Sequence, residues 1–384
     1  MEPLAANQDP KTSQASGESP SETAPIEQRP APLKKGSALA RLGGIAVLLL
    51  GVVGAFLYLG GWLSPDKLTP ARFVDEFQKV NGTYSGFRRN HAKGVGVGGF
   101  FDSNGQGARL SKAVVFQTGR VPVIGRFSLG GGDPHAGDDL STVRGLGLQF
   151  SLSDGEQWRT AMINLPVFPF KDPQAFYDNL VASAPDPNTR QPDPAKMAAF
   201  LSNNPETARA LGIIKSHAPS SGFDNSTFYG LNAFRFVNAD GTSTPVRWTL
   251  VPVQAYEAAS AAAASQDKNF LFEALIASVL QHPLQWHLIV TLGQPGDPTN
   301  DATLPWPEGR EQIDVGTVTL ESVESEETSP ARDINFDPLI LPDGIQPSDD
   351  PLLSARSAIY SQSFTRRAGE AKQPSAIAPS EVRK

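Results

Sequence analysis

The sequence predicts an α+β domain built on an antiparallel sheet or barrel, preceded by one membrane-spanning helix. Three observations predict this fold class. Strand-like runs, separated by Gly, Asp and Pro clusters, dominate the first part of the main domain. Helical stretches are grouped after these runs, which is typical of an α+β domain. An uncharged apolar stretch precedes all of these elements.

The first 63 residues fall into two segments of different composition. Residues 1–41 are mostly polar and rich in proline, so we expect a disordered tail that cannot bury enough apolar surface to fold. Residues 42–63 carry no charge, and crossing a bilayer takes about 20 such residues. A cleaved signal peptide has a shorter apolar core, of about 7–15 residues, close to the N-terminus. A buried helix of a soluble protein is the weaker alternative, because no charge interrupts the stretch.

Basic residues before the apolar stretch indicate its orientation. Lys34, Lys35 and Arg41 flank its near end, and positive charge tends to stay on the cytoplasmic side. We therefore expect a single-pass protein of a bacterial inner membrane whose main domain is periplasmic. Residues 370–384 are polar, and we expect them to form a flexible tail.

The composition excludes several classes of function. The net charge is −7, which argues against a nucleic-acid partner. The absence of cysteine excludes disulfides, thiolate nucleophiles and Cys-bound metals. No histidine pair has the spacing of a helical zinc site. The run GVGVGG at 94–99 matches GxGxxG, but a helix-like stretch precedes it and a strand-like one follows, so we reject nucleotide binding.

The elements of the main domain follow from hydrophobic periodicity and from prolines near helix starts. We expect helices at residues 69–80, 176–182, 194–201, 205–211, 270–280 and 352–364. We expect strands at residues 95–101, 113–118, 121–128, 146–152, 158–165, 228–237, 246–253, 286–292 and 315–320.

Several short segments carry chemically distinctive residues in a fixed order. They are RRNHAKG at 88–94, RFS at 126–128, TVRG at 142–145, NLPVF at 164–168, KDP at 171–173, FYG at 228–230, NFDP at 335–338, LPDGI at 341–345 and RSAIY at 356–360. Each segment alone is weak, and RxxxY in particular arises by chance. The ordered set over residues 73–369 resembles the haem catalases. Because the chain lacks the arm and extensions of large catalases, it resembles the shorter catalase-related peroxidases.

The resemblance implies a fold, a cofactor and a set of site residues. The fold would be an eight-stranded antiparallel barrel with surrounding helices, here over residues 69–369. The cofactor would be non-covalent haem b, with Tyr360 as the iron ligand. His91 would be the distal acid and base, with its ring held by the Ser128 hydroxyl. The further cofactor-binding residues would be Arg88, Arg126 and Arg367 at the propionates, Phe176 over the haem and Arg356 beside the tyrosine.

These residue types suit the cleavage of a peroxide. Cleavage moves one proton between the two oxygens, and a histidine within hydrogen-bond reach can accept and return it. A phenolate ligand needs a nearby cation, because free tyrosine ionises only near pH 10. Arg356 and Tyr360 are four residues apart and so share one face of a helix. Singly, each of these residues would be read as an ordinary core or surface residue.

Three departures from the family bear on the expected activity. Matching its proline and phenylalanine puts Ile163 where catalases have their catalytic asparagine, with Asn164 one residue later. Asn232 replaces the proximal histidine, and Ser361 replaces the proline after the tyrosine. We therefore predict a haem-dependent peroxidase with weak or no catalase activity. It would reduce hydrogen peroxide or organic hydroperoxides with a small organic electron donor.

Two alternatives remain at this stage. One is a lipid hydroperoxide isomerase or lyase of the allene oxide synthase branch, whose substrate a membrane anchor would suit. The other is a haem-binding or haem-sensing module without catalysis. The expected partners are the peroxide, the donor and the membrane, and a homodimer is compatible with the sequence.

Overall fold

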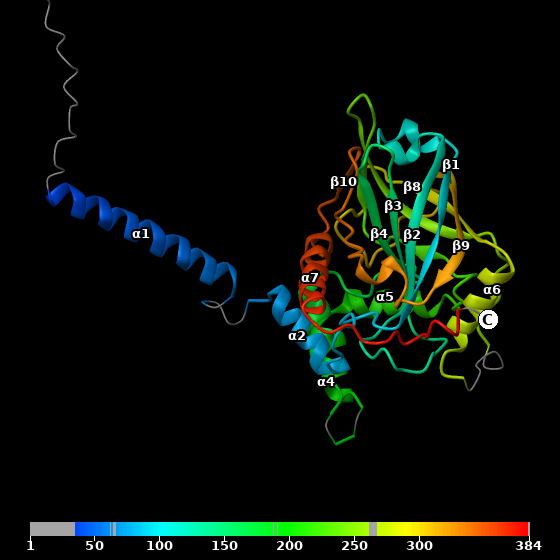
Figure 1. Cartoon of the computed structure of the whole chain (residues 1–384), viewed down its shortest axis with the longest axis horizontal. Coiled ribbons are helices and arrows are strands. Elements are labelled where there is room, and N and C mark those ends of the chain that lie inside the picture. The colour runs from blue at the N-terminus through cyan, green and yellow to red at the C-terminus, as the bar shows by residue number, and fades with distance from the viewer. Residues whose placement is uncertain are drawn as a thin grey trace, which may run out of the picture. The chain divides into compact units, whose positions relative to one another are not determined.

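We describe a computed structural model of the chain, which covers residues 35–61, 63, 67–186, 188–189, 191–260 and 267–382. The chain divides into two units, Met1–Pro65 and Asp66–Lys384, which are described separately. In the first unit, α1 spans Lys35–Leu59, and its part Leu39–Leu59 is long and apolar enough to cross a membrane (Figure 1).

The boundaries of the first unit differ from those predicted. Residues 1–34 of the predicted tail, 1–41, lie outside the described residues. Its last seven residues, 35–41, belong to α1. The helix ends at Leu59 rather than at residue 63. The reason is the glycine pair that follows, in which Gly61 adopts a φ of 80°.

A closed eight-stranded antiparallel barrel forms the second unit (Figure 1), which confirms the predicted fold class. Its strands are β1 Gly94–Ser103, β2 Gly119–Leu129, β3 Arg144–Ser151, β4 Gln157–Ile163, β5 Phe228–Tyr229, β7 Ser243–Pro252, β8 Leu284–Leu292 and β9 Gln312–Glu324. Pairing of β7 with β8 closes the barrel. Two short strands, β6 Phe234–Val237 and β10 Ile345–Pro347, continue the sheet beside β7.

Large aromatic side chains fill the barrel interior. Burial alternates along β4, where Trp158 and Met162 are buried and their neighbours are only partly covered. Trp158 stacks on Phe150 with ring centroids 4.7 Å apart and meets Trp248 edge-on at 5.2 Å. Each such ring contributes both buried apolar area and a favourable ring geometry.

The helices are α2 Pro70–Asn81, α3 Pro173–Ala182, α4 Pro194–Asn203, α5 Pro205–Lys215, α6 Phe270–Gln281 and α7 Pro351–Ala368. All but α6 begin with proline, whose fixed φ suits the first helical position. The side chains of Thr69, Asp172, Asp193 and Asp350 cap four of these helices by accepting a backbone N–H hydrogen bond. Helices α2, α3 and α7 pack against one another.

Two predicted strands differ from the structure. Residues 113–118 contain a short 3-10 turn at Val114–Phe116 instead of a strand. An apolar turn whose side chains are buried in the core has the same composition as a strand, so the sequence did not distinguish the two. Residues 228–237 form two strands instead of one. Between them the chain leaves the ladder at Leu231, whose φ is 64°.

Residues 370–382 belong to the segment predicted as a flexible tail, 370–384, and one of them packs against the barrel. Ile377 is completely buried, and its carbonyl oxygen accepts a hydrogen bond of 2.7 Å from Ser325 Oγ. The overall polarity of the segment does not reveal this buried isoleucine.

The glycine run at 94–99 lies inside β1. It therefore does not form the loop between a strand and a helix that binds a dinucleotide. Its lack of side chains allows close packing of neighbouring groups. A Cβ atom at Gly94 would lie 2.5 Å from the guanidinium carbon of Arg126, and one at Gly96 would lie 2.0 Å from Ser329 Oγ. The run therefore makes room for an arginine beside the strand.

A buried ion pair joins the segment before β1 to α6. Lys93 Nζ lies 2.6 Å from Asp138 Oδ1, and the two side chains are 3% and 0% exposed. The same ammonium donates to the carbonyl oxygens of Ala136 and Lys268, at 3.0 Å each. Asp138 Oδ2 accepts the backbone N–H of Leu271, at 2.8 Å, in the first turn of α6.

We predict that Asp138→Ala lowers the free energy of unfolding by about 3–5 kcal/mol, because it leaves the Lys93 ammonium buried without its counter-ion. Urea unfolding of the detergent-solubilised chain, followed by tryptophan fluorescence, measures this loss. The matched control is Asp343→Ala, which removes the partner of the exposed Lys112 and should have a much smaller effect. Equal losses in the two variants would contradict the prediction.

Candidate functional site

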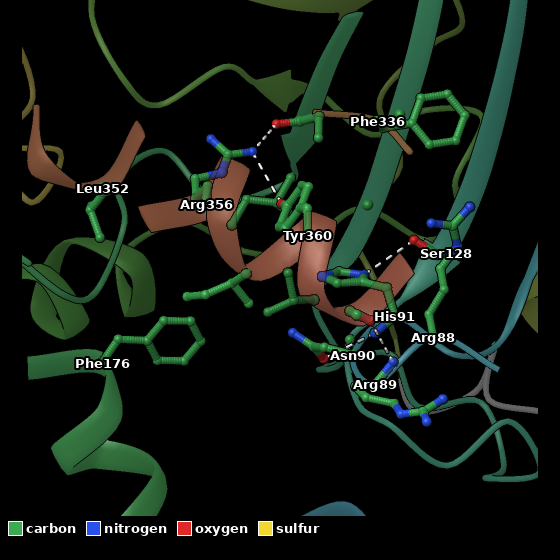
Figure 2. Close-up of a pocket in the computed structure, with 18 of the residues that line it drawn as sticks. Arg88, Arg89, Asn90, His91, Ser128, Phe176, Phe336, Leu352, Arg356 and Tyr360 are labelled. Atoms are coloured by element: carbon green, nitrogen blue, oxygen red, sulfur yellow. Dashed lines mark hydrogen bonds between the residues drawn. The ribbon is translucent and has the colours of Figure 1, made fainter. Parts of the chain in front are cut away.

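A cavity of about 360 Å³ lies beside strands β2 to β4 and is bordered by α2, α3 and α7. Figure 2 shows its lining, with residues from both ends of the domain meeting in one space. The structure brings all eight predicted site residues to this cavity, namely Arg88, His91, Arg126, Ser128, Phe176, Arg356, Tyr360 and Arg367.

His91 lies in the turn that leads into β1, with a left-handed φ of 55° that is uncommon for a residue other than glycine. Its Nδ1 is 3.1 Å from Ser128 Oγ on β2, which leaves Nε2 available to a ligand in the cavity. Gly145 on β3 makes room for this contact. A Cβ atom at Gly145 would lie 2.9 Å from Ser128 Oγ and 3.1 Å from His91 Cε1.

The surroundings of His91 favour its neutral form. Burial, followed by the positive charges of Arg126, Arg88 and Arg356, lowers the pKa of His91 from 6.5 to about 4. A neutral imidazole has a free lone pair, so at neutral pH it can accept a proton from a ligand.

Tyr360 stands on α7 at the end of a chain of hydrogen bonds (Figure 2). Arg356 Nη2 lies 3.3 Å from Tyr360 Oη and 2.8 Å from the carbonyl oxygen of Ala161. Arg356 Nη1 donates to Asn232 Oδ1, and Asn232 Nδ2 donates to Asp350 Oδ2 at 2.7 Å. The guanidinium is thus held on two sides while it faces the phenol oxygen.

Three guanidinium groups, those of Arg88, Arg126 and Arg367, gather at one edge of the cavity. Among the described residues, Arg88 Nε and Arg367 Nε and Nη2 are buried donors without a hydrogen-bond partner. Burial and the charge of Arg126 lower the pKa of Arg88 well below its ordinary value and that of Arg367 to about 10. Unsatisfied cationic donors of this kind favour an anionic ligand such as a carboxylate.

Glu326, the buried counter-ion of Arg126, was not among the residues predicted from sequence. Arg126 Nε and Nη2 donate to its two carboxylate oxygens at 2.7 and 2.9 Å, and both side chains are buried. Burial opposes the charged carboxylate, but Arg126, Arg88 and Arg367 outweigh it and lower the pKa of Glu326. Glu326 lies 200 residues from Arg126 in the chain and belongs to no recognised motif, so no sequence signal marked it.

The structure also clarifies the segment in which a catalytic asparagine was sought. Ile163, the last residue of β4, lines the cavity, whereas Asn164 is not among its described lining residues. Asn164 Oδ1 instead accepts the backbone N–H of Arg144 at 2.8 Å. The Asn164 side chain therefore forms a hydrogen bond to the backbone, and the apolar Ile163 lines the cavity.

Comparisons with known proteins agree on one family. The family model described as Catalase matches residues 64–378. A catalase-related peroxidase of Synechococcus elongatus is 36% identical over 324 residues, covering 84% of this chain and 96% of that protein. One from Mycolicibacterium paratuberculosis is 33% identical and covers 79% and 96%. A solved bacterial catalase has a TM-score of 0.66 at 22% identity, over 76% of this chain and 60% of that chain, which is a likeness of fold.

We predict that Glu326→Gln lowers the free energy of unfolding of the cofactor-free protein, because Arg126 loses its buried counter-ion. Because the pKa of Glu326 is lowered from 4.5 on folding, the carboxylate stabilises the protein above that pH. The difference between wild type and variant should therefore be constant above about pH 5.5 and shrink as the pH falls below about 4.5. Urea unfolding at several pH values measures it, with the exposed Glu324→Gln as control. A difference that grows on acidification would refute the assignment.

Proposed function

This chain belongs to the catalase family, and from that premise we propose that it is a haem-dependent peroxidase with weak or no catalase activity. Its relatives among the catalase-related peroxidases indicate an oxidoreductase that acts on a peroxide, and the family implies a haem cofactor. The observation that carries the proposal is a single cavity faced by two hydrogen-bonded pairs, His91 with Ser128 and Arg356 with Tyr360.

The donors around the cavity fit haem b. Tyr360 would provide the oxygen ligand to iron, with Arg356 stabilising the phenolate. The unsatisfied donors of Arg88 and Arg367, together with Arg126, would bind the two propionate carboxylates. Phe176 would cover the ring as part of an apolar wall. When bound, haem supplies the electrons that break the O–O bond and later recovers them from the donor.

The residues opposite Tyr360 would handle the proton. The Nε2 atom of neutral His91 accepts the proton of the inner peroxide oxygen and returns it to the outer oxygen as the O–O bond breaks. The outer oxygen then leaves as water from hydrogen peroxide, or as an alcohol from an organic hydroperoxide. Ser128 keeps the ring in place through its contact with Nδ1.

The apolar Ile163 supports a peroxidase over a catalase. Catalase turnover requires a second hydrogen peroxide to be held in the cavity while it gives up two electrons and two protons. Ile163 offers no hydrogen bond for that purpose at the place where the family has an amide. A small organic donor, which needs no such site, would then return the electrons.

We place the protein in a bacterial inner membrane as a single-pass protein, with the main domain in the periplasm. The apolar helix Leu39–Leu59 supports the anchor. Lys34, Lys35 and Arg41 before it support a cytoplasmic tail.

A second candidate function is the conversion of lipid hydroperoxides without an external donor. Phenylalanines of α2 and α3 favour it, because they give the cavity an apolar wall that suits a hydrocarbon chain. Phe176 meets Phe73 edge-on at 5.2 Å and Phe77 at 5.8 Å.

We predict that the chain, expressed with adequate haem, shows a haem absorption band that Tyr360→Phe largely abolishes or shifts, because a phenyl ring cannot bind iron. The visible spectrum and the haem-to-protein ratio measure this. Tyr256→Phe, at an exposed tyrosine, is the matched control. A wild-type protein without the band would refute the cofactor, and a Tyr360→Phe variant with the wild-type spectrum would refute the ligand.

We predict that the haem-loaded protein oxidises a small organic donor with hydrogen peroxide and evolves little oxygen. An oxygen electrode and donor absorbance, read in parallel, measure the two activities. His91→Leu should lower donor oxidation about 10²–10⁴-fold, the usual contribution of a general acid–base group. Fast oxygen evolution without donor oxidation would contradict the proposal, and donor-free conversion of a fatty-acid hydroperoxide would favour the second candidate.

A further inference from the structure

Asn90, directly before His91, lines the cavity beside the histidine ring (Figure 2). Its Oδ1 accepts two backbone N–H groups, that of His91 at 3.0 Å and that of Gly131 at 2.8 Å. Because both partners can only donate, they fix the orientation of the carboxamide, with the oxygen toward the turn. Its NH₂ group is left on the other side, without a hydrogen-bond partner among the described residues.

The cavity lining from β4 lacks the amide that the resemblance to catalases would place at residue 163. Ser128, Gly145 and Ile163 are directly paired across β2, β3 and β4, so they form one row in the sheet. Ile163 is therefore one strand, roughly 5 Å, from the glycine that packs against His91. The amide of Asn232, another lining residue, is already used at both ends by Arg356 and Asp350.

We propose that the Asn90 amide is a catalytic hydrogen-bond donor. It lies in the turn of His91 and takes the place of the amide that is missing at Ile163 on β4. This inference rests on the proposed function and names a further residue of the same site. As the O–O bond breaks, the outer oxygen gains negative charge before it receives the proton held by His91. An N–H of Asn90 stabilises that charge and gives up no proton itself.

Asn90 also has a structural role, because its Oδ1 holds the turn in which His91 has a positive φ. The test must therefore separate the donor from the acceptor. Asn90→Ser keeps an oxygen that can accept a backbone N–H but removes the amide. Ile163→Asn then returns an amide to the cavity from a different strand, which cannot repair the turn. Ile163→Leu is the matched control, because it stays apolar.

Fluoride is the probe, because it binds ferric haem and accepts hydrogen bonds from groups on the open face. We expect Asn90→Ser to raise the dissociation constant of fluoride about tenfold, as the loss of one hydrogen bond to a charged acceptor does. The double variant Asn90→Ser, Ile163→Asn should recover affinity to within about threefold of wild type by the same reasoning, whereas Asn90→Ser, Ile163→Leu should not. Stopped-flow reaction with hydrogen peroxide should follow the same order.

The inference would be overturned if Asn90→Ser bound fluoride as tightly as wild type, or if Ile163→Asn did not reverse the loss of affinity. A haem band in the wild-type protein would, in either case, leave the proposed function intact. Lack of a haem band in the wild type would instead refute the proposed function, and the inference with it. If Asn90→Ser does not hold haem, Asn90→Asp retains an acceptor oxygen in place of Oδ1. This variant is tested with neutral hydrogen peroxide, and an unchanged rate would overturn the inference.

Discussion

Pairing of β7 with β8 closes the barrel, and the site depends on that closure. A closed sheet has no free edge, so the strands that border the cavity keep a fixed register. Within that register, Gly94, Ser128, Gly145 and Ile163 occupy one row across four strands. Ser128 contributes a hydroxyl to this row and Ile163 an apolar side chain, whereas the two glycines leave space for neighbouring groups. The His91 ring and the Arg126 guanidinium fit beside the two glycines.

The same positive charges act on two different groups in the cavity. Burial, together with the charges of Arg126 and Arg88, lowers the pKa of His91, so the imidazole stays neutral. With Arg367 they also make the cavity edge attractive to carboxylates, and Glu326 already neutralises one of them. The proposed acid–base group and the proposed anion-binding edge therefore both depend on the same three arginines, together with burial.

Much of this site could be predicted because its residues occur in short segments with fixed spacing. Arg356 and Tyr360 share a helical face by their spacing alone, and proline with an Asp or Thr cap marks most helix starts. Glu326 could not be predicted, because only folding brings it to an arginine far away in the chain. Asn90 stood in a recognised segment, but its orientation depends on two backbone donors that sequence does not show. The strand predicted at 113–118 was wrong because composition does not distinguish a turn that fills a core from a strand. The strand predicted at 228–237 is divided in two because the chain leaves the ladder at Leu231, in a backbone conformation that its sequence does not indicate.

Helix α7 holds both sides of the cavity together. It carries Arg356 and Tyr360, and Glu370, just after its end, pairs with Arg89 in the segment that also holds His91. The Arg89 side chain is buried, so this latch does not open without exposing it to water. Loss of this pair would therefore uncover a buried charge. The position of the segment that carries His91 is thus tied to the folding of the last turn of α7.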